Sequence, residues 1–252
     1  MERTKSNYFS ATRLSAIALF GALSAVLYVL GFSISGIFPY WLELNFSDIP
    51  ALIGTFSLGP VSGALIIVVK ILIKLLFKPT STIFVGELAD LLIGLALVVP
   101  AGIIYKKNRT FKGALLAVAV GSAASVAMGI LANWLVLIPF YLDLYFGGDW
   151  GKLVGPMQAL FPSVTQESFY TFYLWGSVLP FNFLRCLVAV LVTLPIYKHI
   201  SRAVNHLNER LTPSRGEGAE RAKKINLGVL LGFIAVLALG ILFVVLRFFL
   251  WK

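Results

Sequence analysis

Ionisable side chains inside apolar stretches are the residues of this sequence whose chemistry most needs an explanation. Lys70 and Lys74 lie four positions apart in one apolar run, and Glu87 and Asp90 lie three apart in the next. Residues at these spacings share one face of a helix. A charge in hydrocarbon is costly, so each must face protein, water or a ligand. For Lys70 and Glu87 we favour a salt bridge that joins the two helices, whereas for Lys74 and Asp90 a salt bridge and a ligand contact both stay open.

Three more polar residues lie in later apolar runs. Asn133 lies about two turns from the end of one run, and Asn182 and Arg185 share a face just inside the next. A single amide could simply hydrogen-bond a neighbouring helix. Two amides and an arginine in one layer, with aromatic neighbours such as Trp134 or Phe181, instead predict a pocket for a flat molecule with a polar edge.

A polar turn at residues 44–54 lies between two apolar stretches. Asp48 followed by Pro50 is a helix-start signal, because a carboxylate can cap free N–H groups and proline fits the first turn. The helix can run only to Gly59-Pro60, about 15 Å or half a bilayer. Half-length helices of this kind often place polar groups inside a membrane in order to hold a ligand or ion.

The composition indicates an all-α, polytopic membrane protein. Of the 252 residues, 59% are hydrophobic and 13% are charged, and the mean hydropathy is +0.90. This length leaves no room for a separate ATPase or a large soluble enzyme. The single Cys186 excludes a disulfide framework, and the two histidines provide no zinc-binding spacing. Without a Walker A motif, a catalytic triad or a metal constellation, the sequence predicts a transport subunit and not an enzyme.

The apolar runs define the expected elements. They predict spans at 14–34, 61–77, 83–105, 112–140, 173–197 and 225–246, a short helix at 50–58, a Gly- and aromatic-rich loop at 142–172 and a basic segment at 198–224. We therefore expect a six-helix membrane domain at 1–205, a basic cytoplasmic linker at 206–224 and an additional C-terminal transmembrane helix at 225–252.

Small residues recur at two places where helices could approach closely. Every fourth position from Gly113 to Gly129 carries Gly, Ala or Ser, a spacing that predicts internal helix packing. Ala18 and Ala22 form a second small patch on the first span. For this patch, internal packing and a docking face for another membrane protein both stay open.

The distribution of Lys and Arg predicts the orientation. Most of the 21 basic residues fall at 1–13, 106–112 and 198–224, whereas the other loops carry mainly acids. The positive-inside rule places these basic segments in the cytoplasm, together with the N-terminus, so the pocket opens outward and the tail after the seventh span lies outside. The net charge of +10 is then a topology signal attracted to the anionic lipid bilayer, and no nucleic acid is needed to explain it.

Four ordered motifs carry a family resemblance. They are residues 44–50 (LNFSDIP), 56–63 (FSLGPVSG), 132–141 (ANWLVLIPFY) and 179–185 (LPFNFLR). Over about residues 10–205 the chain resembles the riboflavin-specific S components of energy-coupling factor (ECF) transporters. The resemblance implies a six-helix subunit in the cell membrane of a prokaryote that captures riboflavin from outside. It also implies a membrane coupling protein (the T component) and two cytoplasmic ATPases as partners, toppling in the bilayer to release the vitamin, and no cofactor besides the transported ligand.

The resemblance also implies functional residues. The family's ligand-contacting amides fall on Asn133 and Asn182, its nearby basic residue on Arg185, where lysine is usual, and its coupling patch on Ala18 and Ala22. This chain departs from the family in carrying Lys74 and Asp90 at asparagine positions, and in its seventh span. The candidate substrate-binding residues are Asn133, Asn182, Arg185, Asp48, Phe46, Lys74 and Asp90.

Two other function classes are alternatives to the S component. A stand-alone, proton-coupled carrier of a small planar vitamin would use Glu87 and Asp90 as a proton relay. A membrane enzyme would need an acid or base converging with a nucleophile, and no such pair is evident. We favour the transport subunit, and the sequence leaves open whether it prefers riboflavin, its phosphate or another flat vitamin.

Overall fold

The computed structural model describes residues 11–80 and 82–211. Its first half contains α1 (Ala11–Val29), β1 (Phe32–Ser33), β2 (Glu43–Leu44), α2 (Asp48–Leu58), α3 (Pro60–Phe77) and α4 (Val85–Lys107). Its second half contains α5 (Phe111–Ala132), η1 (Asn133–Leu137), α6 (Ile138–Phe146), α7 (Gly151–Gln158), α8 (Phe169–Tyr173), η2 (Leu174–Val178) and α9 (Leu179–Leu211). Because α5 to α6 and α8 to α9 each run on without a break, five long apolar helices and the short α2 make the predicted six-helix membrane bundle.

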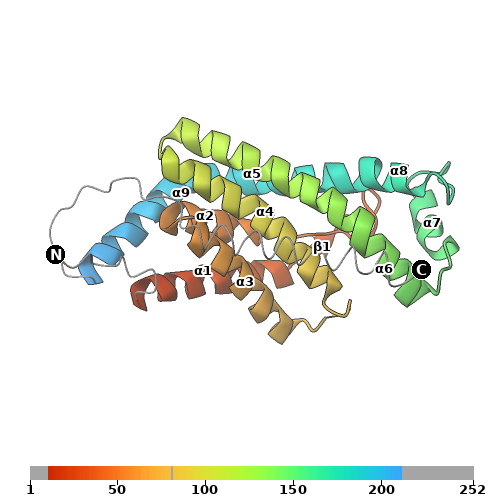
Figure 1. Cartoon of the computed structure of the whole chain (residues 1–252), viewed down its shortest axis with the longest axis horizontal. Coiled ribbons are helices and arrows are strands. Elements are labelled where there is room, and N and C mark those ends of the chain that lie inside the picture. The colour runs from red at the N-terminus through yellow and green to blue at the C-terminus, as the bar shows by residue number, and fades with distance from the viewer. Residues whose placement is uncertain (1–10, 81, 212–252) are drawn as a thin grey trace.

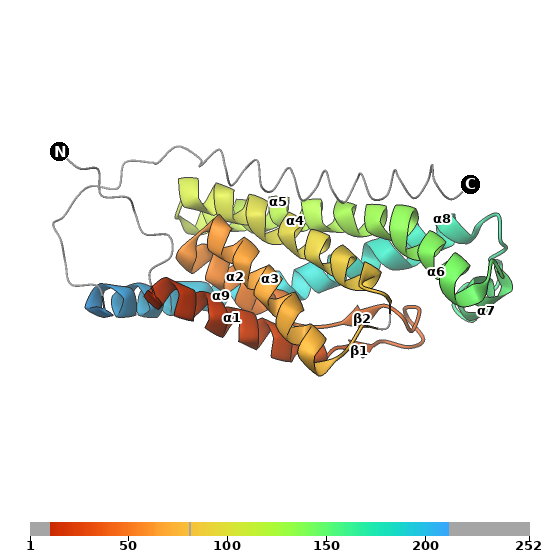
Figure 2. The ribbon, with the colours of Figure 1, turned by 60° about the horizontal axis from the view of Figure 1, so that its bottom comes forward.

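The long helices run along the long axis of the molecule, with α4 and α5 side by side and α7 at one end (Figure 1). The short α2 packs against α1, α3, α4 and α9 and is therefore internal to the bundle. Fully buried side chains such as Leu52, Ile66 and Leu97 form the shared core. The hairpin of β1 and β2 lies toward the same end as α7 (Figure 2).

Several predicted boundaries need correction. The first span ends at Val29, because the chain beyond it turns into the antiparallel hairpin in which Phe32 pairs with Leu44. The predicted loop at 142–172 begins only after Phe146 and contains α7. Helix α9 continues past residue 205, and the rest of the predicted linker and the seventh span lie outside the described residues.

The start of α2 is where the sequence placed it, but the predicted cap is wrong. Asp48 begins the helix, Pro50 lies in its first turn, and Gly59 ends it with a positive φ of 92°. No side chain of the described residues caps the free N–H groups at its start. The Asp48 carboxylate instead accepts a hydrogen bond from Arg185 of α9 and lies 3.5 Å from Lys70 Nζ of α3.

The row of small residues on α5 packs internally, as predicted. All of its members are buried. A Cβ at Gly121 would lie 2.4 Å from the Leu97 carbonyl oxygen, so only glycine lets α5 approach α4 this closely. The Ser125 hydroxyl donates a hydrogen bond to the Ile93 carbonyl at 3.1 Å and joins the same two helices.

Candidate functional site

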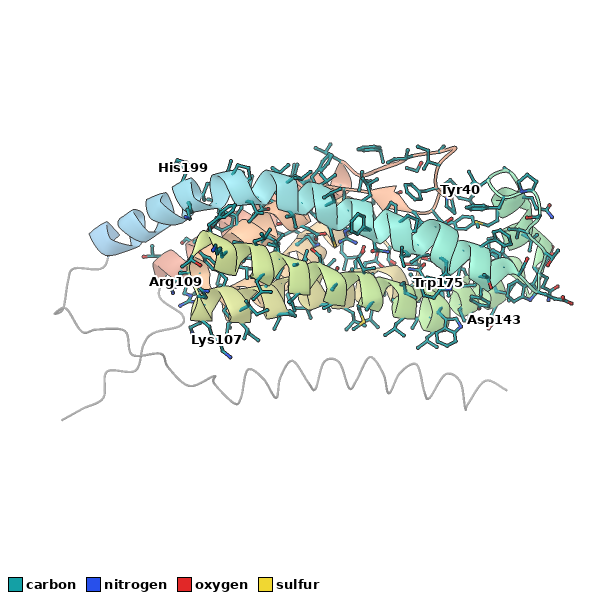
Figure 3. All side chains as sticks on the ribbon, turned by 90° about the horizontal axis from the view of Figure 1, so that it is seen from above. Tyr40, Lys107, Arg109, Asp143, Trp175 and His199 are labelled. Atoms are coloured by element: carbon teal, nitrogen blue, oxygen red, sulfur yellow. The ribbon has the colours of Figure 1, made fainter. Side chains whose placement is uncertain are left out.

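A cavity of about 550 Å³ lies among α1, the β-hairpin, α3, α4, α6 and α9. Its volume is in the range typical of small-molecule sites. Aromatic side chains of its wall are Tyr28, Tyr40, Trp41, Tyr141, Tyr145, Phe146 and Phe181. Figure 3 shows Tyr40 toward the end of the bundle that carries Asp143, whereas Lys107 and Arg109 lie at the opposite end. The cavity therefore reaches the end remote from these basic loops.

Asn133 projects its amide into this cavity in a fixed orientation. Its Nδ2 donates to the Gly129 carbonyl at 2.8 Å, and its Oδ1 accepts from the Tyr173 hydroxyl at 2.7 Å. Tyr173 in turn accepts from Trp41 Nε1 at 3.0 Å, so the hairpin loop is tied to the amide. A primary amide has two N–H groups and two acceptor lone pairs. Within the described part of the chain, Asn133 thus retains one N–H and one lone pair for a ligand.

Asn182 is held in a similar way on α9. Its Nδ2 donates to the Val178 carbonyl at 2.9 Å, and its amide packs against the bare Cα of Gly129. Its second N–H and its Oδ1 have no partner among the described residues. Since Asn133 binds the carbonyl of the same glycine, both amides contact Gly129.

Both amides lie beside a π-helical turn. Asn133 begins η1, in which the Ile138 N–H reaches the Asn133 carbonyl, and η2 closes four residues before Asn182. A proline follows each turn closely, Pro139 after η1 and Pro180 after η2. Proline has no N–H for the usual bond to the carbonyl four residues earlier, which favours the wider turn. Such turns are frequent at functional sites because they re-aim side chains.

Arg185 lies one turn beyond Asn182, and carboxylates surround its guanidinium. Nε and Nη2 donate to the two oxygens of Asp48 at 2.7 and 3.2 Å, and Nη1 lies 3.8 Å from Asp90 Oδ1. The Tyr28 hydroxyl also donates to Asp90. Arg185 therefore reaches the cavity wall with all three of its nitrogens directed at acidic side chains.

The two lysines of α3 serve different partners. Lys74, for which a salt bridge and a ligand contact were both open, forms an ion pair with Glu87 that joins α3 to α4. Lys70 does not contact Glu87, so its predicted partner was wrong. It lies one turn away on α3 and reaches α2 instead, with Nζ 3.1 Å from the Ser47 hydroxyl and 3.5 Å from Asp48.

Five of the predicted site residues line the cavity: Asn133, Asn182, Arg185, Lys74 and Asp90. Asp48 lies behind Arg185 and outside the lining. Phe46 is also outside it, and its ring centre lies 6.3 Å from the ring centre of Phe32. Trp134 is 49% exposed, because it follows Asn133 by one residue and so points about 100° away around the helix.

The small patch on α1 faces away from the core. Ala18 is exposed and Ala22 is half-buried, and their neighbours Leu19 and Leu23 are exposed as well. The core-facing side of α1 uses Ile17 instead. The exposed part of this patch is therefore available to lipid or to another protein.

Three residues of this site were not predicted from the sequence: Tyr28, Trp41 and Tyr173. Tyr28 lines the cavity, contacts Asp90 and lies 5.6 Å by its ring centre from Lys74 Nζ. An aromatic residue with a polar tip near the end of an apolar span was the available signal. Among the described residues, no group of three or more His, Cys, Asp or Glu side chains could hold a metal ion.

Comparisons with known proteins agree on one family. The family model for the substrate-specific component of ECF transporters matches residues 12–197. The chain is similar to the riboflavin transporter RibU of Staphylococcus aureus, with 27% identity over 205 residues that cover 81% of this chain and 98% of that protein. It is also similar to the riboflavin transporter FmnP of Bacillus subtilis, with 23% identity over 181 residues that cover 71% and 87%.

A solved structure shares the fold. It is described as the S component of a bacterial ECF transporter, and it aligns with a TM-score of 0.58 and 27% identity over 78% of this chain and 98% of its own. The family match spans most of the six-helix bundle and all of the cavity-lining residues. The chain therefore belongs to the substrate-specific components of ECF transporters, a family of multi-pass membrane transport proteins and not of enzymes.

Proposed function

We propose that this protein binds riboflavin in the cavity from the outer side and delivers it inward with a membrane coupling protein and two ATPases. The observation that carries the proposal is the pair of oriented amides, Asn133 and Asn182, which both contact Gly129. The names of two relatives, both riboflavin transporters, support the choice of substrate.

The chemistry of the flavin ring fits this pair of amides. One edge of the planar ring alternates carbonyl acceptors with an imino donor, and each asparagine retains both a donor and an acceptor. Aromatic residues of the wall, including Trp41 and Phe181, can cover the faces of a flat ring. Asn133 cannot rotate freely because Tyr173 and Gly129 hold both ends of its amide, so little ordering entropy is lost on binding.

The distribution of charge supports entry from outside. Lys107 and Arg109 lie at the end of the bundle opposite Tyr40 of the cavity wall (Figure 3). Under the positive-inside rule these basic loops face the cytoplasm, with the N-terminus on the same side. The cavity then faces the exterior, where a captured vitamin arrives.

Coupling to a partner is assigned to the exposed patch on α1. Ala18 and Ala22 allow another helix to approach closely without touching the cavity lining. We assign this face to docking of the coupling protein. We assign the energy supply to the ATPases, because the sequence has no nucleotide-binding motif.

The alternative of a proton-coupled carrier has weaker support. A relay carboxylate must exchange protons freely, but Glu87 is paired with Lys74, and Asp90 with Arg185 and Tyr28. Uptake into vesicles that contain this chain alone, driven by a pH gradient, would favour the carrier over the S component.

The first prediction concerns the two amides. Purified protein without nucleotide should quench riboflavin fluorescence, and Asn133→Ala or Asn182→Ala should each weaken binding. Leaving ligand hydrogen bonds unmade in a dry pocket costs about 1–3 kcal/mol, or roughly tenfold to a hundredfold in Kd. The matched control is Gln166→Ala, which removes an exposed amide outside the cavity lining.

The titration can also refute the proposal. Parent protein that fails to quench the flavin at micromolar concentration would exclude riboflavin as the substrate. Parent-like affinity in both asparagine variants, with normal folding, would place the flavin elsewhere. In that case the α3 and α4 side of the cavity, with Lys74 and Asp90, would be the next place to mutate.

A further inference from the structure

Every basic side chain in the described cavity wall is already paired with an acid. Lys74 pairs with Glu87, and the half-exposed Lys78 pairs with Glu43 at 2.9 Å. The third basic residue, Arg185, directs its three nitrogens at Asp48 and Asp90, as described above. Among the described residues of the wall, basic and acidic side chains therefore balance, with no cation left over.

The acids are also held in place. One oxygen of Glu87 accepts from Thr80 and Thr82 at 2.9 and 3.1 Å, while the other faces Lys74. The ammonium of Lys74 lies 5.6 Å from the centre of the Tyr28 ring, which occupies another of its sides. A ligand anion could reach Lys74 only by displacing a carboxylate that several groups fix.

From this balance we propose that the cavity selects uncharged flavin and rejects its 5′-phosphate, with Glu87 and Glu43 as the specificity-determining residues. The inference rests on the proposed function, since it presupposes that the cavity binds a flavin and concerns only which flavin side chain it accepts. The ribityl chain of riboflavin carries only hydroxyl groups, which can donate to the carboxylates of the wall. The phosphate ester adds nearly two negative charges at neutral pH and has no hydroxyl at that end.

The electrostatic reason is the fate of the displaced carboxylate. If the phosphate took Lys74 from Glu87, the carboxylate would stay in the wall beside a dianion, without its cation. Like charges at such short range repel strongly where water is scarce, and an unpaired buried charge is itself costly. Riboflavin avoids both costs because it leaves every ion pair of the wall intact.

The test compares the Kd of riboflavin with that of riboflavin 5′-phosphate on the full chain, using flavin fluorescence quenching at about pH 8, where the ester is dianionic. We expect the parent to bind the phosphate at least about tenfold more weakly, which corresponds to about 1.4 kcal/mol. Glu87→Gln keeps the side-chain shape but leaves the ammonium of Lys74 without its carboxylate partner. The ratio of the Kd of the phosphate to the Kd of riboflavin should therefore fall at least about threefold. Glu167→Gln, the same change at an exposed residue outside the cavity, should leave the ratio unchanged.

A second variant guards against a folding defect. Glu43→Gln releases Lys78 at a half-exposed pair, where the fold loses little, and should lower the ratio in the same direction. Equal affinity of the parent for the two flavins would overturn the inference, as would an unchanged ratio in the glutamine variants that still bind riboflavin. Failure of the parent to bind either flavin would instead overturn the proposed function.

Discussion

Gly129 offers the sharpest test of the amide arrangement, because the three atoms nearest to an added methyl group all belong to Asn182. A Cβ at this position would lie 2.8 Å from Asn182 Nδ2 and 2.9 Å from both Cγ and Oδ1. Atoms cannot approach this closely, so the Asn182 amide must move. The Gly129 carbonyl that holds Asn133 is part of the backbone and stays in place.

The expected magnitude follows from what the methyl group disturbs. Displacing the Asn182 amide removes its ligand hydrogen bonds, so Gly129→Ala should weaken riboflavin binding by about 1–3 kcal/mol, or roughly tenfold to a hundredfold. The fold should tolerate the change, because the obstructing atoms form the end of a side chain. Replacing glycine by alanine inside a helix also gains up to about 1 kcal/mol, which offsets part of the strain.

Fluorescence titration and thermal unfolding in detergent measure the two effects separately. Gly155→Ala is the matched control, since a Cβ there meets no atom of the described residues within 4 Å. In a double-mutant cycle, Asn182→Ala should abolish most of the effect of Gly129→Ala, because both changes act through the same amide. Additive losses, or parent-like binding by a folded Gly129→Ala protein, would refute this account of the pocket.

Two further predictions concern the core of the bundle and the exposed surface of α1. Asp48→Ala leaves Arg185 buried without its main partner and should cost about 3–5 kcal/mol of unfolding free energy; an unchanged melting temperature would mean that Asp90 alone compensates the guanidinium. Ala18→Trp or Ala22→Trp should leave riboflavin binding intact but stop uptake in cells, because bulk at this face blocks helix docking. Ala119→Trp, at an exposed alanine of α5, is the matched control, and equal loss of binding and uptake in the α1 variants would instead indicate internal packing.

The helices were predictable because the membrane imposes a simple rule on the sequence. A span needs a long apolar run, so α3, α4 and most of α5 were located from hydropathy alone. The short α2 was found from Asp48, Pro50 and the Gly59-Pro60 break. The amides were also found, since Asn133 and Asn182 stood out against apolar neighbours. In each case the signal was local in sequence.

Partner choice was not predictable, because it depends on how helices distant in sequence come together. Lys70 was expected near Glu87, since the two helices are joined by a short loop. Lys70 instead faces the internal helix α2, where Asp48 lies 3.5 Å from its Nζ. The contact of Trp41 with Tyr173 crosses 132 residues and has no local signature. Single-sequence patterns give the depth and face of a residue, but not its neighbour on another helix.

The two π-helical turns explain how two separate helices can present a pair of amides to one cavity. Pro139 and Pro180 each remove one backbone N–H, and the Ile138 and Leu179 N–H groups bond instead to carbonyls five residues earlier. Each turn inserts extra rotation beside an asparagine, and each asparagine then anchors its amide on the carbonyl four residues before it. Since Gly129 supplies one of these carbonyls and the bare surface for the other amide, the site depends on backbone geometry as much as on side chains. This dependence is the reason why a methyl group at Gly129 should impair binding although it contacts no ligand.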